Sequence, residues 1–425
     1  MRVEMTTMLR LRACAIRTAL SVSLVAGLLA GTAAVTLAQV PSGCAVYASG
    51  LAAPRFVAVG ADGTVYVTEA ASGGSEQLER PAQLPPQVPV FTNRGLTGRV
   101  TRIGAGGAKT AIVTNLPSYA SPTEQGGAAG IAVSGGNLLV AVGNPGPLTP
   151  FIAPLPNDSS VLRITPQGAT TRIADIGAIE RTRNPDPNAV DTNLYGLAVA
   201  ANGTIYVADA GGNAVYRVNP TTGAADVLAV IPGLPSPQPN PARGGRSEMD
   251  PVPTGVAVGA DGNVYVGLLS GFPFPEGAGK VVRISPTGQV SDFATGLTAV
   301  TGVAVGPDRN VYVSEIFRFD PSATPPFRPG RVLRVLPTGA TQVVADNLNT
   351  PNGLAFDRSG TLYIVTGSVT PDGQVLRCAG VAGAVALPAT GAGPAGALKL
   401  ALPATAGAVT LLVLLAGTAL TRCRA

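Results

Sequence analysis

The chain has 425 residues, of which only 12% are charged and none is histidine. The absence of histidine excludes Ser-His-Asp and Cys-His nucleophile systems and any histidine-bound zinc or iron site. The formal net charge of +5 comes from the two ends of the chain. Without four arginines and Glu4 at the start, and without Lys399, Arg422 and Arg424 at the end, 22 basic and 23 acidic residues remain. The basic balance is therefore no evidence for a nucleic-acid partner.

The first 38 residues have the pattern of a secretory signal peptide. Four arginines precede a largely apolar run from Ala19 to Ala34, and Thr36-Leu37-Ala38 offers small residues for cleavage before Gln39. This pattern predicts export, with an uncleaved membrane anchor as the alternative.

Residues 39–380 are expected to be all-β, because no 15-residue window between the two ends keeps a helical period of apolar residues. The clearest unit is Pro253–Leu297, which contains the short β-branched runs GVAV, NVYV, KVVRI and VSDFA. Asp261-Gly262 follows the first run and Pro286-Thr287-Gly288 follows the third, and both are tight-turn signals. The unit therefore predicts a four-stranded antiparallel sheet.

Six copies of this unit recur along the chain. Their first two strands are expected at 54–70, 129–143, 195–210, 254–269, 301–316 and 352–367. A single sheet cannot bury both of its faces, whereas six sheets arranged in a ring can. The predicted fold is a six-bladed β-propeller with four antiparallel strands in each blade.

The last copy ends after its third strand, and the missing fourth strand is expected at the amino end, over Cys44–Leu51. Aligned with the clearest unit, Cys378 takes the place of Ile284 and Cys44 takes the place of Val290. Those positions flank the tight turn between the third and fourth strands. We therefore predict a Cys44–Cys378 disulfide that replaces the missing turn, with two unpaired thiols as the alternative.

The long joins of the repeats are those after the second strand and those between repeats, and both kinds are expected on one face, here called the long-loop face. Phenylalanine is unusually frequent in the joins after the second strand: Phe91, Phe151, Phe272, Phe274, Phe317, Phe319 and Phe327. These rings either pack the loops into a lid or line an apolar pocket. Phe272, Phe274, Phe317 and Phe319 are the candidate ligand-contacting residues.

Three acids occupy one strand-two position in the first, third and fifth repeats: Glu69, Asp209 and Glu315. Together with Asn352 they are the candidate ligands of a divalent cation such as Ca²⁺. The alternative is that each acid caps a turn or pairs with an arginine. The loop from Asn184 to Asn193 is rich in oxygen donors and is open to the same two interpretations.

The carboxyl end contains Leu387-Pro388-Ala389-Thr390-Gly391 within a linker, residues 381–400. Residues 401–425 then contain an apolar run from Ala401 to Thr421, long enough to span a bilayer, and a basic tail with Arg422 and Arg424. This pattern resembles an LPxTG sorting signal, which implies that a sortase cleaves between Thr390 and Gly391 and links the protein to the cell wall. A retained transmembrane anchor is the alternative.

Residues 44–378 resemble NHL-type repeats and, more specifically, the ScyD/ScyE family of exported bacterial propellers. The resemblance is carried by residues 50–70, 191–213 and 251–284, the last of which contains Gly-Phe-Pro-Phe-Pro. It implies a six-bladed propeller outside the cytoplasm, without a settled reaction.

A weaker similarity to gluconolactonase-like hydrolases is carried by Pro351-Asn352-Gly353. In the other repeats the position of Asn352 is taken by Arg55, Ala129, Tyr195, Thr254 and Thr301, so the acidic metal-binding set of that family is absent.

The predicted function is that of a secreted, surface-anchored binding or scaffolding module. Its unidentified ligand or protein partner is expected on the long-loop face, and no nucleic acid is expected to bind. The alternative is a metal-dependent hydrolase that uses Asn352 with Glu69, Asp209 or Glu315.

Overall fold

A computed structural model describes residues 40–84, 90–187, 190–240, 243–271, 274–320, 322 and 327–383. The predicted signal peptide, the sorting motif with Thr390 and Gly391, the carboxyl-terminal apolar run and Phe272 lie outside these residues. Within the described part of the chain, no helix has both the length and the apolar character needed to cross a membrane.

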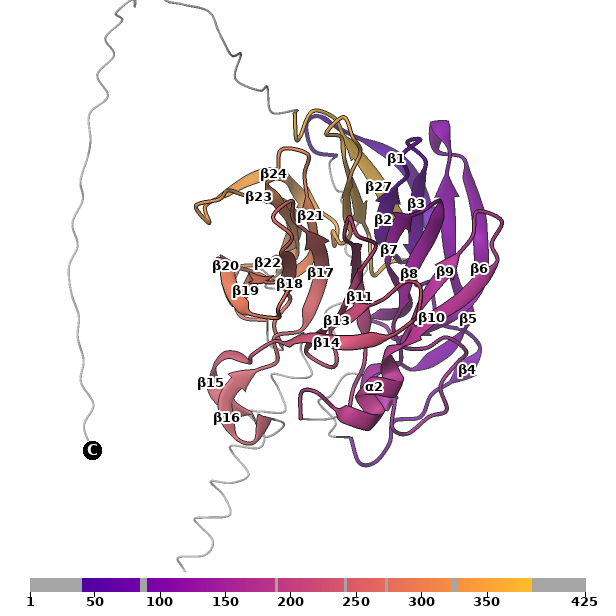
Figure 1. Cartoon of the computed structure of the whole chain (residues 1–425), viewed down its shortest axis with the longest axis vertical. Coiled ribbons are helices and arrows are strands. Elements are labelled where there is room, and N and C mark those ends of the chain that lie inside the picture. Colours follow the sequence, from indigo (N-terminus) through magenta and orange to yellow (C-terminus); the bar gives the residue numbers. More distant parts are fainter. Residues whose placement is uncertain are drawn as a thin grey trace, which may run out of the picture. The chain divides into compact units, whose positions relative to one another are not determined.

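The described residues form an all-β propeller, in which four separate sheets each contain four antiparallel strands (Figure 1). The first separate sheet contains β11 (Leu194–Val199), β12 (Ile205–Asp209), β13 (Ala214–Val218) and β14 (Ala225–Val230). The second contains β17 (Pro253–Val258), β18 (Val264–Leu268), β19 (Gly279–Ile284) and β20 (Val290–Leu297). The third contains β21 (Val300–Val305), β22 (Val311–Phe319), β23 (Phe327–Val335) and β24 (Thr341–Leu348). The fourth contains β25 (Leu354–Phe356), β26 (Leu362–Thr366), β27 (Gly373–Cys378) and β1 (Cys44–Leu51).

The remaining repeats are joined in one nine-stranded sheet, so the structure has four separate blades and not the predicted six. This sheet contains β2 (Pro54–Val59), β3 (Val65–Glu69), β5 (Asn93–Ile103), β6 (Lys109–Ala120), β7 (Gln125–Ser134), β8 (Asn137–Val142), β9 (Ser160–Ile164) and β10 (Thr170–Asp175), with β4 (Glu76–Gln77) paired to β5.

The two repeats merge because β6 continues beyond its predicted end and pairs with β7. The chain reverses within four residues, where the Ser121 amide donates to the Glu124 carbonyl over 2.8 Å. Gly127 has a φ of 134°, and a Cβ there would lie 2.2 Å from the Pro117 carbonyl oxygen. Only glycine allows the two strands to approach so closely at this position.

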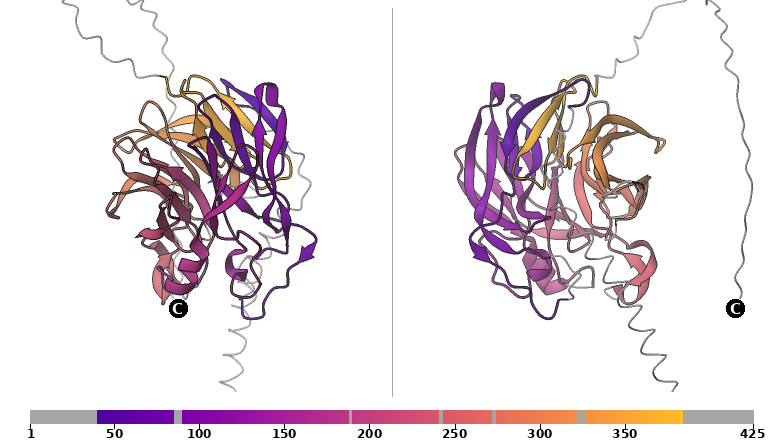
Figure 2. Two further views of the ribbon diagram at one scale, coloured as in Figure 1. Left: turned by 45° about the vertical axis from the view of Figure 1, so that its right-hand side comes forward. Right: turned by 180° about the vertical axis from the view of Figure 1, so that it is seen from behind.

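The ring closes as predicted. β1 pairs with β27 in antiparallel register, with Cys44 opposite Cys378. The two cysteines form a disulfide across a sequence separation of 334 residues. Seen from behind, the amino-terminal strand in indigo lies beside the carboxyl-terminal strands in yellow (Figure 2).

The first strands of the repeats form the inner layer, where β2, β7, β11, β17, β21 and β25 contact one another in sequence and β25 returns to β2. Glycine at the same position of these strands makes the close approach possible. A Cβ on Gly255 would lie 2.3 Å from the Val303 nitrogen, and a Cβ on Gly302 would lie 2.2 Å from the Asn352 oxygen. The recurring glycine is therefore a packing requirement. In β2 its place is taken by Phe56.

The joins carry secondary structure that the sequence did not predict. α2 (Ile176–Arg183) is a short helix within the all-β fold; it is eight residues long, and the Asp175 side chain caps it by accepting from the Ala178 nitrogen. β15 (Leu234–Asn240) pairs with β16 (Arg246–Met249), and η1 (Ala105–Gly107) and η2 (Gly146–Leu148) are short 3₁₀ turns. β4, α2, β15 and β16 gather at one end of the blades, the lower end in Figure 1, which agrees with the expected long-loop face.

Candidate functional site

Three residues from different repeats meet at the centre of the inner layer. The Asn352 amide donates to the Tyr195 hydroxyl over 2.8 Å, although 157 residues separate them. The Arg55 guanidinium lies 4.7 Å from the centre of the Tyr195 ring. The Phe56 ring, which replaces the repeated glycine, packs edge-on against Tyr195 at 5.5 Å. We call Arg55, Tyr195 and Asn352 the axial cluster.

The axial cluster contains polar groups whose hydrogen-bonding capacity is not used. Asn352 is fully buried, and its Oδ1 has no hydrogen-bond partner. Arg55 is 7% exposed. Among the described residues it makes no ion pair or hydrogen bond, and its contact is with the face of the Tyr195 ring. No Arg55 nitrogen is among the buried atoms that have no partner, so its N–H groups keep contact with water. The buried Asn352 oxygen without a partner is costly, and the stability of the fold does not explain it.

Glu124 lies near enough to act on the same cluster. Burial raises the pKa of Glu124, and the charge of Arg55 opposes this shift. The Glu124 side chain is nevertheless exposed to solvent. Its carboxylate therefore contacts water, although dense protein lies around it. Burial also raises the pKa of the Tyr195 hydroxyl, which Arg55 and Asn352 counteract. The centre of the inner layer is therefore polar, charged and open to solvent at Glu124.

The neighbouring positions of the inner strands have a structural role. The Thr254 hydroxyl donates to the Val300 carbonyl over 2.8 Å, and the Thr301 hydroxyl donates to the Pro351 carbonyl over 3.0 Å. Each bond links the first strand of one repeat to the start of the next repeat. Threonine at this position therefore ties adjacent repeats together, whereas Arg55, Tyr195 and Asn352 depart from that pattern.

Two of the predicted metal ligands are occupied by arginines. Glu69 accepts two bonds from Arg99, at 2.8 and 2.6 Å, and one from the Ala52 nitrogen at 2.6 Å. Burial would raise the pKa of Glu69, but the bonds from Arg99, Thr101 and the Ala52 nitrogen outweigh it and lower the pKa.

Glu315 repeats this arrangement in another sheet. It accepts from Arg331 at 2.6 Å and from the Thr298 nitrogen at 2.8 Å. In both sheets the arginine lies directly opposite the acid on the neighbouring strand. The two glutamates therefore hold a blade to the loop that precedes it, and they have no free oxygen to offer a cation.

Asp209 occupies the same position but has no arginine, because Ala214 lies opposite it. Its Oδ1 accepts from the nitrogens of Asn193 (2.7 Å) and Gly212 (3.0 Å), and its buried Oδ2 has no partner. Burial raises the pKa of Asp209 to about 8, and the charges of Asp191 and Glu180 add to the shift, while the two backbone bonds oppose it.

The four predicted metal ligands thus do not come together. Among the residues that the structure describes, no group of three or more acidic, cysteine or histidine side chains is arranged to hold a metal ion. The oxygen-rich loop from Asn184 to Asn193 does not favour calcium either, because Asp186 accepts from the Asn213 amide (2.9 Å) and from Arg243 (3.2 Å). Asn188 of this loop lies outside the described residues.

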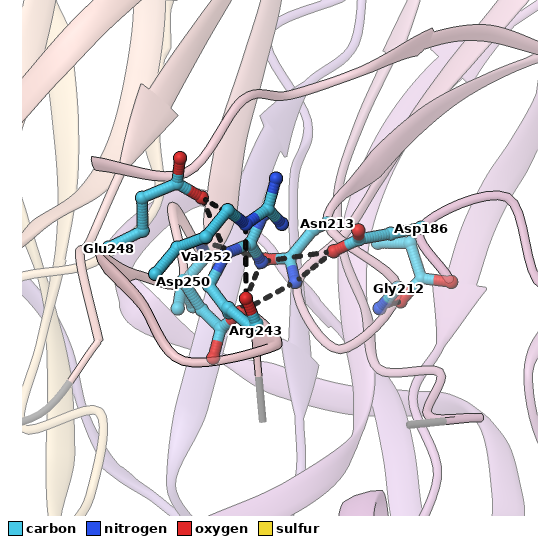
Figure 3. Close-up of polar contacts among 9 residues, drawn as sticks. Asp186, Gly212, Asn213, Arg243, Glu248, Asp250 and Val252 are labelled. Carbon is cyan, nitrogen blue, oxygen red and sulfur yellow. Dashed lines mark hydrogen bonds and ion pairs between the residues drawn. The ribbon is translucent and has the colours of Figure 1, made fainter. Parts of the chain in front are cut away.

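Arg243 is the centre of a buried polar network on the long-loop face (Figure 3). It is 4% exposed and lies within ion-pair distance of Asp186 (3.2 Å), Glu248 (3.3 Å) and Asp250 (2.6 Å). Asn213 donates to both aspartates and accepts from the Val252 nitrogen. The network joins the loop after α2, the turn before β13 and the join that carries β15 and β16.

Phe274, in the join between β18 and β19, and the phenylalanines of β22 and β23 pack against one another. Ring centres are 5.8 Å apart for Phe274 and Phe317, 4.8 Å for Phe317 and Phe327, and 6.4 Å for Phe319 and Phe327. β22 and β23 stay paired out to Phe319 opposite Phe327. The predicted loop is therefore largely an extended hairpin, and ring-to-ring packing is the arrangement expected of a lid. Contact of these rings with a ligand stays a prediction.

Sequence reasoning missed Arg55, Tyr195, Glu124 and Arg243 as functional candidates. The only signal for Arg55 and Tyr195 was their departure from threonine at one repeated position. Arg243 lies in a glycine-rich join with no motif, and its acidic partners are up to 57 residues away.

Replacing Asp209 by asparagine is expected to stabilise the protein at pH 8 and to have little effect near pH 4. The folded-state pKa of about 8 lies above the ordinary value near 4, so the wild type loses stability as the pH rises through this window. The loss is at most about 1.4 kcal/mol per pH unit, and asparagine does not titrate. Urea unfolding at several pH values measures the difference. Asp226→Asn, on the exposed side of β14, is the control; an equal gain at all pH values would contradict the prediction.

No family model and no curated protein sequence matches the chain. Similar solved structures include a virginiamycin B lyase from Staphylococcus aureus, with 15% identity and a TM-score of 0.41, covering 76% of this chain and 94% of that chain. An aldose sugar dehydrogenase from Streptomyces coelicolor has 14% identity and a TM-score of 0.48, covering 79% and 99%. A gluconolactonase from Xanthomonas campestris has 14% identity and a TM-score of 0.48, covering 81% and 92%. These similarities assign no activity, and the ScyD/ScyE and sorting-signal resemblances stay predictions.

Proposed function

We propose that the protein is an exported, surface-anchored β-propeller that binds a ligand at the axial cluster, on the long-loop face. The observation that carries this proposal is Arg55, which is only 7% exposed, makes no hydrogen bond or ion pair among the described residues, and keeps its N–H groups open to solvent. Guanidinium donors that the fold holds at the centre of the inner layer and does not use are available to a ligand.

The chemistry of the cluster favours an anionic ligand that carries hydroxyl groups. The Arg55 guanidinium suits a carboxylate or phosphate oxygen. The unpartnered Oδ1 of Asn352 accepts from a hydroxyl, and the face of Tyr195 provides an apolar wall. A metal-dependent hydrolase is less well supported, because Glu69 and Glu315 are held by arginines.

The finer account of the fold belongs to the same proposal. Each half of the nine-stranded sheet repeats the strand order of a separate blade, and the inner strands contact one another in a closed cycle. We therefore count six blades, two of them fused. Export through residues 1–38 and anchoring after Thr390 are consistent with a disulfide, which forms in oxidising compartments.

The test separates binding from stability at one residue. Arg55→Met is expected to keep or raise the melting temperature without ligand, because it removes a largely buried side chain whose charge makes no ion pair. Gluconate, an anionic polyol, should raise the melting temperature of the wild type but not of this variant, and sorbitol should raise neither. Arg102→Met, on an exposed position of β5, is the control. If Arg55→Met is destabilised and gluconate shifts neither protein, with or without Ca²⁺, Arg55 is structural and the proposal fails.

A further inference from the structure

A second site lies away from the axial cluster. A cavity of about 470 Å³ lies between the join of β8 and β9 and the segment formed by β10 and α2. This volume is in the range of small-molecule sites. One wall is apolar and is formed by Pro145, Ile152, Pro154 and Leu155. The rest of the lining is mostly polar and includes both acidic and basic side chains.

The rim of this cavity carries two guanidiniums that share one carboxylate. Arg172 and Arg181 lie 3.6 and 3.7 Å from the Asp175 oxygens, beyond the usual length of a charge-assisted hydrogen bond. Asp175 already caps α2 by accepting from the Ala178 nitrogen at 2.9 Å. Both arginines are about half exposed, at 53% and 49%. The rim therefore has an excess positive charge and free N–H donors.

The polar lining also includes a buried acceptor without a partner. Asp158 is 9% exposed, and its Oδ2 accepts from the Tyr119 hydroxyl at 2.5 Å and from the Leu155 nitrogen at 2.7 Å. Its Oδ1 is buried and has no hydrogen-bond partner. Burial raises the pKa of Asp158 to about 7, against the opposing effects of Tyr119, the Leu155 nitrogen and Arg94. Asp158 lines the cavity, but Oδ1 itself is closed to solvent, so a ligand donor meets this oxygen when the side chain turns toward the cavity.

The walls of the cavity are held in place by backbone geometry. The Ser159 carbonyl accepts from the nitrogens of Ile176 (2.9 Å) and Gly177 (3.2 Å), which fixes the join to the first turn of α2. Ser159 itself has a φ of 52°, a conformation that costs energy in a residue other than glycine. The Asn144 amide donates to the Ser159 hydroxyl over 2.8 Å. The backbone of the cavity walls is therefore preformed.

We propose that this cavity binds a small organic carboxylate with an apolar body and a hydroxyl or amino donor at its other end. The carboxylate accepts from Arg172 and Arg181, the body packs against Ile152 and Leu155, and the donor meets the Asp158 carboxylate, whose side chain turns toward it. This site shares no residue with the axial cluster, so the two proposals fail independently.

Three probes of one shape test the proposal by calorimetric titration of the full-length protein. The first, 3-(4-hydroxyphenyl)propionate, has both ends. The second, 3-phenylpropionate, lacks the donor, and the third, 3-(4-hydroxyphenyl)propanamide, lacks the charge. The first is expected to bind on the order of tenfold more tightly than either of the others, since each end contributes about one hydrogen-bonded group.

Variants assign the two ends. Arg181→Gln and Arg172→Gln should each weaken the two carboxylates on the order of tenfold and leave the amide unchanged. Arg183→Gln, an exposed arginine on the same helix that does not line the cavity, should change nothing. Asp158→Asn should remove the advantage of the hydroxyl; circular dichroism checks that this variant folds. Equal binding of acid and amide, carboxylate binding that survives both arginine replacements, or no binding of any probe would each overturn the proposal.

Discussion

Replacing Cys44 and Cys378 together by serine is expected to lower the free energy of unfolding by on the order of 2–5 kcal/mol. The bridge closes a loop across a sequence separation of 334 residues, so the unfolded chain loses much conformational freedom when it is present. In the folded protein the same bridge holds β1 against β27, where other blades have a covalent turn. Urea unfolding with and without reductant measures the loss.

The location of the effect tests its cause. Hydrogen exchange in the double variant should rise first in Cys44–Leu51 and Gly373–Cys378, and later in β11–β14, which do not contact the bridge. The wild type treated with reductant is the matched control and should reproduce the variant. Unchanged stability would mean that the strand pairing alone closes the ring.

The intact mass of protein taken from the cell surface should show the bridge and the ends predicted near Gln39 and Thr390.

Replacing Arg243 by methionine is expected to destabilise the protein by roughly 3–5 kcal/mol at neutral pH. The replacement fills the space of the side chain but leaves Asp186, Glu248 and Asp250 without their shared cation. Asp186 is 5% exposed, so water cannot take over the role of the arginine. Chemical unfolding at pH 7 measures the cost.

Arg246→Met is the matched control for this prediction. Arg246 is in the same join and also lies near Glu248, at 3.4 Å, but it is 58% exposed. Exposed ion pairs contribute little, so its replacement should cost less than about 1 kcal/mol. Similar losses for the two variants would show that the join tolerates no change at all, and that the buried network is not the cause.

Some features of the fold could be predicted because the turns and strands recognised in one copy of the repeat apply to the other copies. Asp261-Gly262 and its counterparts mark turns, and the alternation of buried residues marks strands, so the strand positions of every copy follow from one copy. The Cys44–Cys378 pairing followed by the same transfer, from Ile284 and Val290. α2 was not predicted because eight residues are too few to establish a helical period of apolar residues.

The candidate sites were harder to predict because the position of a residue in its strand does not identify the residue opposite it on the neighbouring strand. Glu69, Asp209 and Glu315 are equivalent in sequence, yet Arg99 and Arg331 neutralise two of them while Ala214 leaves the third without a counter-ion. The metal hypothesis depended on three equivalent acids, and the structure makes them different.

Local sequence was enough to place most strands of each repeat and their antiparallel order, because turns and two-residue periodicity act over a few neighbouring residues. The closure by Cys44 and Cys378 followed from comparing one repeat with another. Which side chains meet depends on the folded chain. β6 pairs with β7 because Gly127 admits a close approach. Arg55, Tyr195 and Asn352 converge because the inner strands form a closed cycle. These contacts depend on burial and on distances between residues far apart in the chain, which no local pattern records.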